Sequence, residues 1–196
     1  MTMYFIVDCT WPESENGEAL MRIDNTFRLG EVRTWKSGKP HKPERLTFEQ
    51  PVRIAFEPLR GYRGLPIELL DLGIPIMSDR LHRAIVGAGV TNVEWFDVSL
   101  HDTTGQEYAY KAYNVVGLIA AADLAKSDWS STSGKPTTDV SFDHLVIDPA
   151  RAGDALLFRL AENVNALMIH QHVRHAIERA GIDTVRFIAA ENWVQI

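Results

Sequence analysis

The fold is decided by two stretches of sequence that read nearly alike, 92 positions apart. The first is Ile76-Met-Ser-Asp-Arg-Leu-His-Arg-Ala-Ile-Val-Gly-Ala-Gly-Val-Thr-Asn-Val-Glu-Trp95, and the second is Met168-Ile-His-Gln-His-Val-Arg-His-Ala-Ile-Glu-Arg-Ala-Gly-Ile-Asp-Thr-Val-Arg-Phe187. Their apolar positions match almost throughout, while polar positions such as Glu94 and Arg186 differ. Self-similarity of this kind reveals a structural unit. What repeats is packing, so the two units are expected to be scaffold.

Each stretch predicts a helix, a glycine stop and a strand. In the first, Ser78 is a good helix N-cap, and apolar residues then recur at the spacing of one helix face. Gly89 and Gly181 stand where a helix ends in the left-handed conformation. The apolar helix positions are Leu81, Ala84, Ile85 and Ala88 in the first unit and Val173, Ala176, Ile177 and Ala180 in the second. In the strands that follow, Val93 and Trp95, or Val185 and Phe187, share one face.

The rest of the chain predicts mainly strands. They are expected at 4–9, 22–24, 28–35, 52–56, 144–148 and 155–160, with one more strand of about the usual length within 107–122. Residues 126–143 are rich in Ser and Thr and are expected to form a long loop or hairpin, whereas 36–45 form a basic, proline-containing loop that is either solvated or in contact with a partner. Strands mixed with two short helices indicate an α+β fold with a mixed, mostly antiparallel sheet. Within it, 76–98 and 168–190 are helix–Gly–strand units related by an internal pseudo-repeat.

The composition indicates one soluble domain, residues 1–196, in the cytoplasm. A chain of 196 residues can bury a substantial core. The net charge of -6 argues against a nucleic-acid partner. The negative charge either keeps the protein soluble or forms an acidic face that binds a basic protein. Cys9 is the only cysteine, so no internal disulfide forms. No apolar run is long enough to cross a membrane, and the first residues read as a strand and not as a signal peptide.

No residues with a catalytic or metal-binding pattern stand out. His172 and His175 share a helix face with Arg179, and a permanent cation beside two potential ligands disfavours a metal ion. Cys9 lies in an apolar strand, where a buried, inert thiol is the usual outcome. We therefore expect no catalytic residues, no metal and no cofactor. The alternative is an enzyme of unknown reaction with acid–base residues at Asp143, His144 and Asp148.

Four tryptophans stand in polar surroundings: Trp11, Trp35, Trp129 and Trp193. Such residues either supply contact area at a protein interface or cover the edge of a core. Covering the core is the preferred interpretation for each of them taken singly. Trp129, between Asp128 and Ser130, is the best candidate for an interface.

Three blocks of sequence resemble a bacterial polymorphic-toxin immunity family, the eleventh in a numbered series of such families and formerly a domain of unknown function. The first block is Pro75-Ile-Met-Ser-Asp-Arg-Leu81 with Ala88-Gly-Val90 and Val93-Glu-Trp-Phe96. The middle block is Tyr113-Asn-Val115 with Asp123-Leu124 and Ser127, and the last is Leu157-Phe-Arg-Leu160 with the helix from His170 and Gly181 to Phe187. The resemblance covers about residues 65–190, whereas the N-terminal part, 1–64, matches loosely. Ile169-His170 departs from the family's usual helix start.

The resemblance implies a cytosolic protein that binds and neutralises one cognate polymorphic or secretion-system effector toxin, and the family carries no catalytic residues to transfer. Because loops on a rigid scaffold carry function, the contact surface is expected around Asp123, Asp128 and Trp129. The partner is then a toxin protein and not nucleic acid or membrane. The alternatives are the enzyme described above and a structural subunit of a larger assembly, and a homodimer stays open.

Overall fold

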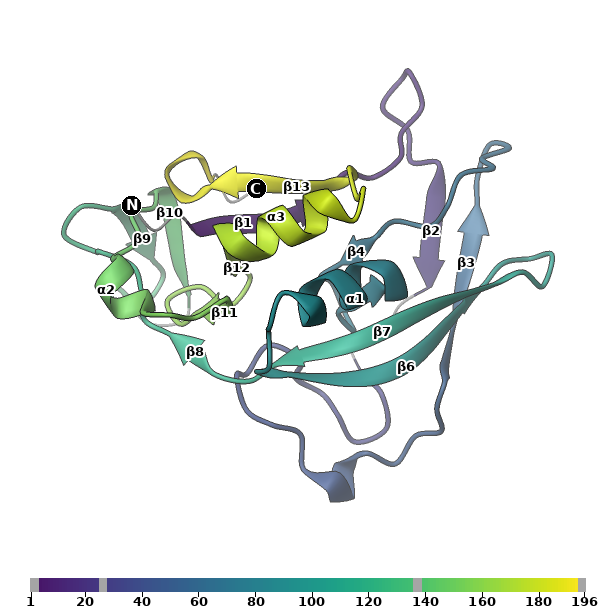
Figure 1. Ribbon diagram of the computed structural model, residues 1–196, viewed down its shortest axis with the longest axis horizontal. Coiled ribbons are helices and arrows are strands. Elements are labelled where there is room, and N and C mark those ends of the chain that lie inside the picture. The colour runs from purple at the N-terminus through teal and green to yellow at the C-terminus, as the bar shows by residue number, and fades with distance from the viewer. Residues whose placement is uncertain (1–3, 25–27, 136–138, 194–196) are drawn as a thin grey trace.

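The computed structural model describes residues 4–24, 28–135 and 139–193, and its strands form two larger sheets and a small hairpin (Figure 1). The larger sheet has six strands in the order β2-β3-β6-β7-β5-β4. They are β2 (Met21–Asp24), β3 (Val52–Pro58), β4 (Leu69–Leu70), β5 (Ile76–Ser78), β6 (Val93–His101) and β7 (Glu107–Val115). Only β3 and β6 run parallel among these neighbours.

The second sheet has five strands in the order β13-β1-β12-β11-β8. They are β1 (Tyr4–Cys9), β8 (Leu118–Ile119), β11 (Leu157–Leu160), β12 (Leu167–His170) and β13 (Val185–Ala189). The hairpin pairs β9 (Asp128–Ser131) with β10 (Val140–His144). The helices are α1 (Asp79–Gly87), α2 (Pro149–Ala152) and α3 (Gln171–Arg179), with short 3-10 turns η1 (Pro43–Arg45) and η2 (Ala190–Asn192). The α+β prediction with mixed, mostly antiparallel strands is confirmed.

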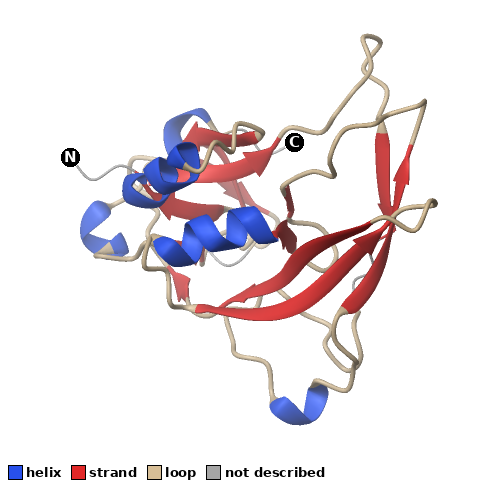
Figure 2. Cartoon of the chain, turned by 45° about the vertical axis from the view of Figure 1, so that its right-hand side comes forward, coloured by secondary structure: helices blue, strands red, loops and turns tan. Residues whose placement is uncertain are grey.

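Each of the two similar stretches folds into a strand, a helix and a second strand. In the first, β5 leads into α1 and then β6; in the second, β12 leads into α3 and then β13. The two strands of each unit do not pair with each other, because a third strand lies between them: β7 in one sheet and β1 in the other. Both neighbours are antiparallel to that central strand, so the helix connects parallel strands. The helices α1 and α3 contact each other where the two sheets meet (Figure 2).

The expected helix ends are confirmed in both units. The Ser78 hydroxyl accepts a hydrogen bond from the Leu81 amide at 3.1 Å, which satisfies a free donor of the first turn of α1. His170 begins α3 in a similar way, because its ring nitrogen accepts from the His172 amide at 3.1 Å. After the helices, Gly89 and Gly181 have φ of +89° and +70°, the left-handed region in which a side chain is strained.

Apolar residues form two core clusters on opposite faces of the five-stranded sheet. Alternate residues of a strand point to opposite faces, so Phe5 lies in the large cluster with α1, α3 and the six-stranded sheet, whereas Tyr4 and Ile6 lie in the smaller one. The same division separates Leu157 from Phe158 on β11. Burial on both faces explains why β11 and β12 are almost continuously apolar in sequence.

Some sequence predictions for single strands were wrong. Residues 28–35 contain only an isolated bridge between Leu29 and Val32, because this part turns sharply. Residues 144–148 are not a strand either: β10 ends at His144, and Asp148 begins α2. The expected strands at 4–9, 22–24 and 52–56 are confirmed, and 126–143 contains the expected hairpin.

Candidate functional site

The excursion singled out from the sequence is a hairpin whose inner face lies on the smaller core cluster. Trp129 of β9 is opposite Phe142 of β10, and both pack in this cluster. Asp128 and Ser130 alternate with Trp129 and are exposed. The hairpin therefore presents a polar outer face from a firmly packed base.

The three predicted contact residues differ in how freely they can meet a partner. Asp128 is exposed, and Asp123 is bound by Lys126, whose Nζ lies 2.6 Å from its Oδ2. That hydrogen bond lowers the pKa of Asp123. Trp129 is half-buried, and its indole nitrogen donates to the Leu124 carbonyl at 3.2 Å. Asp128 is thus the member of this set best placed for contact, while Trp129 also holds the hairpin to the core.

The alternative acid–base residues have separate structural partners. The Nδ1 atom of His144 lies 3.2 Å from the Glu191 carbonyl oxygen. Asp148 accepts a hydrogen bond from the Ala150 amide at 2.9 Å, which caps α2, and also pairs with Arg151. Asp143 is exposed on β10. Across residues 4–24, 28–135 and 139–193, no group of three or more His, Cys, Asp or Glu side chains could hold a metal ion.

Most of the four tryptophans that stand in polar stretches of the sequence cover the core, which is the interpretation preferred from the sequence alone. Trp35 is 2% exposed and Trp193 is 9% exposed. Trp11 is partly buried against the large cluster. Cys9 is also buried, and burial raises the pKa of its thiol, which agrees with an unreactive cysteine.

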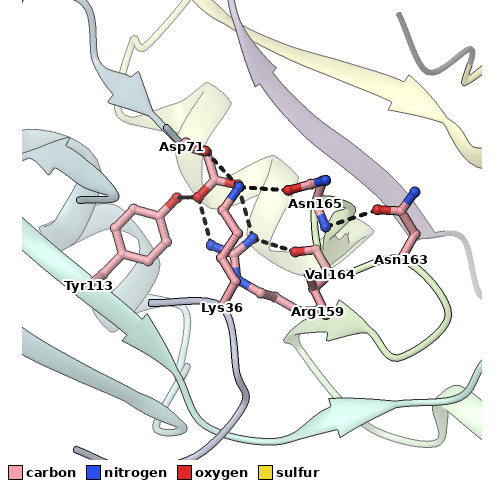
Figure 3. A network of polar contacts seen from close by, with 7 residues as sticks. All are labelled: Lys36, Asp71, Tyr113, Arg159, Asn163, Val164 and Asn165. Atoms are coloured by element: carbon pink, nitrogen blue, oxygen red, sulfur yellow. Dashed lines mark hydrogen bonds and ion pairs between the residues drawn. The ribbon is translucent and has the colours of Figure 1, made fainter. Parts of the chain in front are cut away.

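A charged network at the centre of the molecule was not anticipated from the sequence (Figure 3). Arg159 of β11 is completely buried and makes a bidentate contact with Asp71, which follows β4, at 2.9 and 2.6 Å. The Tyr113 hydroxyl of β7 donates to the same carboxylate at 2.8 Å. Lys36, from the segment before β3, completes the network with its Nζ 3.1 Å from Asp71 Oδ2. These contacts join the two larger sheets to each other.

Hydrogen bonds from neighbouring groups satisfy much of the charge in this network. Lys36 Nζ also donates to the Asp71 carbonyl at 2.7 Å and to Asn165 Oδ1 at 3.1 Å, and Arg159 donates to the Val164 carbonyl at 3.1 Å. Burial raises the pKa of Asp71, but the Arg159 and Lys36 cations outweigh it, so the net shift is downward. Burial lowers the pKa of Lys36. The arrangement is a structural clamp in which each cation faces the carboxylate.

The sequence contained one signal for this clamp. Arg159 interrupts the apolar stretch of β11, and a charge in a buried strand requires a partner. The partner could not be identified, because Asp71 is 88 positions away in the chain.

A basic segment, defined as residues 28–45, covers the face of the six-stranded sheet opposite α1. Trp35 packs edge-on against Phe96 of β6 at 5.7 Å, whereas the adjacent Trp95 contacts His82 of α1 at 4.6 Å. The segment includes η1 at its far end, which projects away from the sheets (dark blue, bottom of Figure 1). A surface cavity of about 340 Å³ lies along it. Arg33, Lys39, Lys42 and Arg45 are among the residues that line this cavity.

The model of an immunity protein family, Imm11, matches residues 4–192. The chain belongs to the Imm11 family. The match begins at the first strand, so it takes in the N-terminal part that the sequence motifs matched only loosely. No protein of curated function matches the chain.

Membership in Imm11 indicates the role of an immunity protein. The family match includes both larger sheets, the hairpin and the basic segment. None of the helices in the described part of this Imm11 member is long and apolar enough to span a membrane.

Proposed function

We propose that this protein is a cytoplasmic immunity protein that binds one cognate polymorphic or secretion-system effector toxin and thereby neutralises it. The observation that carries the proposal is the Imm11 match over almost the whole described fold. An immunity protein of this kind works by covering the active site of the toxin or by holding it in an inactive conformation. Both need a rigid surface with a few well-placed contacts.

We place one contact surface on the hairpin and on the residues just before it, at Asp123, Asp128 and Trp129. Its outer face carries the exposed carboxylates of Asp128 on β9 and Asp143 on β10. Trp129 and Phe142 fix the inner face to the core, so these carboxylates are displayed from a packed base. Such a surface suits a basic patch on the toxin, since complementary charge speeds association and selects the partner.

A growth assay tests the function. The product of the neighbouring open reading frame, as the candidate toxin, is expressed in a bacterial host with and without this protein. We expect growth to stop with the toxin alone and to be restored by the protein. If the toxin arrests growth equally in both strains, the neutralising role for that toxin is wrong.

A charge reversal tests the placement of the contact surface. Asp128→Lys should weaken protection, because it puts a cation opposite a basic patch, while the exposed side chain contributes little to folding. Glu15→Lys is the control, because Glu15 is also exposed but lies in the turn before β2. Equal protection by the two variants would remove the hairpin from the interface. Trp129→Ala is a poorer probe, since loss of its packing would also destabilise the hairpin.

A further inference from the structure

The charge of the chain is divided unevenly, and the basic segment is where the positive charge collects. Residues 28–45 contain six lysines and arginines and two glutamates, a net charge of +4. The whole chain carries -6, so the remainder carries -10. A positive surface of this density on an acidic protein is a local feature with its own electrostatic field.

Much of this positive charge is free to meet a partner. Arg28 pairs with Glu31 and Lys36 belongs to the central clamp. Arg33, Lys39, Lys42 and Arg45 are exposed, and none of them forms an ion pair with any described carboxylate. All four line the cavity of about 340 Å³, together with Glu31 and His41.

The segment has little regular structure, yet its backbone is held at several points by buried and half-buried groups. Asn114 is fully buried and donates to the Lys39 carbonyl at 2.9 Å. Glu94 of β6 accepts from the His41 amide at 2.9 Å and from Asn114 at 2.7 Å. At Gly38 the backbone approaches Leu118 so closely that a Cβ atom would lie 2.5 Å from its Cγ.

These anchors fix the geometry from which the cations project. A long irregular segment in a compact domain is usually functional. Here the backbone loses its conformational entropy when the protein folds. Binding of a partner therefore does not have to order the backbone, which would reduce the affinity. The segment therefore has the properties of a preorganised docking surface.

The chemistry of the segment favours carboxylates over nucleic acid. Its only aromatic residue apart from His41 is Trp35, which is 2% exposed, so no indole face is available to stack on a base. The extended, negatively charged backbone of a nucleic acid would also pass the rest of the protein, which has a net charge of -10. A compact acidic patch on a protein would contact only the basic segment. At physiological salt, exposed charges more than about 8 Å apart are largely screened from each other. The negative charge elsewhere on the protein therefore does not cancel the attraction at the basic segment.

We propose that the basic segment docks a carboxylate-rich surface of the toxin, as a second contact of opposite charge to the hairpin; this inference rests on the proposed function for the identity of the partner. Arg33, Lys39, Lys42 and Arg45 supply the attraction. The cavity between them receives Asp or Glu side chains. Two contacts of opposite sign fix the orientation of the partner, because the reversed docking would bring like charges together.

The test compares two triple variants of the full-length protein with equal loss of charge. The first is Lys39→Gln/Lys42→Gln/Arg45→Gln in the basic segment. The control is Arg63→Gln/Lys135→Gln/Arg179→Gln, at exposed cations elsewhere. Titration with an eight-residue glutamate-rich peptide, followed by calorimetry at low salt, measures the surface directly, with an eight-nucleotide oligouridylate as the comparison.

We expect the segment variant to bind the peptide about tenfold more weakly than the wild type, and the control to change by less than about twofold. Equal weakening by both variants, or no binding of the peptide by the wild type, would overturn the docking surface. Tighter binding of the oligouridylate than of the peptide would overturn the choice of carboxylates.

The growth assay then separates this inference from the proposed function. Where the wild type protects against the toxin, the segment variant should protect less than the control variant; equal protection would show that the toxin does not use the segment. If the wild type itself fails to protect, the proposed function and the toxin as partner both fail. The peptide titration still decides whether the segment binds carboxylates.

Discussion

Removing the charge of Asp71 should be the most damaging single change to the central clamp. In Asp71→Asn the side chain keeps its shape, but Arg159 loses its counter-ion. The Arg159 side chain is 0% exposed, so water cannot replace the lost carboxylate. Lys36, 19% exposed, loses the same partner. Breaking a buried ion pair from one side costs about 3–5 kcal/mol, and we expect the free energy of unfolding to fall by that amount.

The reciprocal change should cost less. In Arg159→Met, Asp71 is left 20% exposed and keeps both the Lys36 ammonium and the Tyr113 hydroxyl as partners. The chief losses are the hydrogen bonds that Arg159 made to Asp71 and to the Val164 carbonyl. We expect about 1–3 kcal/mol, the usual cost of leaving a partly buried acceptor with fewer donors.

Urea unfolding followed by tryptophan fluorescence measures both variants. Because the clamp joins the two larger sheets, the wild type should unfold in one transition if residues 1–196 form a single domain, as the sequence predicts. The double variant shows whether the two effects are coupled. The reasoning would be refuted if Asp71→Asn cost less than about 1 kcal/mol, or if Arg159→Met proved the more harmful of the two.

Three further results are expected. Ser78→Ala should lower the free energy of unfolding by about 1 kcal/mol, measured by thermal unfolding, because α1 loses its N-cap bond; an unchanged melting temperature would contradict this. Gly38→Ala should cost about 1–3 kcal/mol by the same measurement, since the Cβ atom would meet Leu118, whereas Gly17→Ala, with φ +74° in open space, should cost less. Burial lowers the pKa of His41 and of His82 below 6.5. The unfolded chain therefore binds more protons just below pH 6.5, so stability should rise as pH rises from the lowered pKa values to 6.5, and a decrease over that range would be inconsistent with both shifts.

The local parts of the fold could be predicted because their signals lie within a few residues of one another. Ser78, the helix spacing after it and Gly89 together specify α1 without any distant contact. The same holds for α3, even though His170 is an unusual cap. The predicted strand at 52–56 also needs no distant signal: its apolar residues Val52, Ile54 and Phe56 stand at alternate positions, which are the buried ones in β3.

The rest of the fold depends on contacts that no local pattern contains. Residues 28–35 have the composition of a strand, but Trp35 and the anchors of the basic segment hold them as an irregular cover on the sheet. The clamp joins Lys36, Asp71, Tyr113 and Arg159, which lie far apart in the chain. Tryptophans in polar stretches could not be told from contact residues, since their burial is decided by elements elsewhere.

The position of β1 between β12 and β13 constrains how the molecule can be made. Residues 4–9 leave the ribosome long before their neighbours at 167–170 and 185–189. Until β12 and β13 have been made, the apolar β1 has no strands to pair with. The long stretch of chain between β1 and these strands also makes their pairing slow. The nascent chain therefore carries an unpaired apolar segment until β13 has emerged, and only then can the five-stranded sheet form.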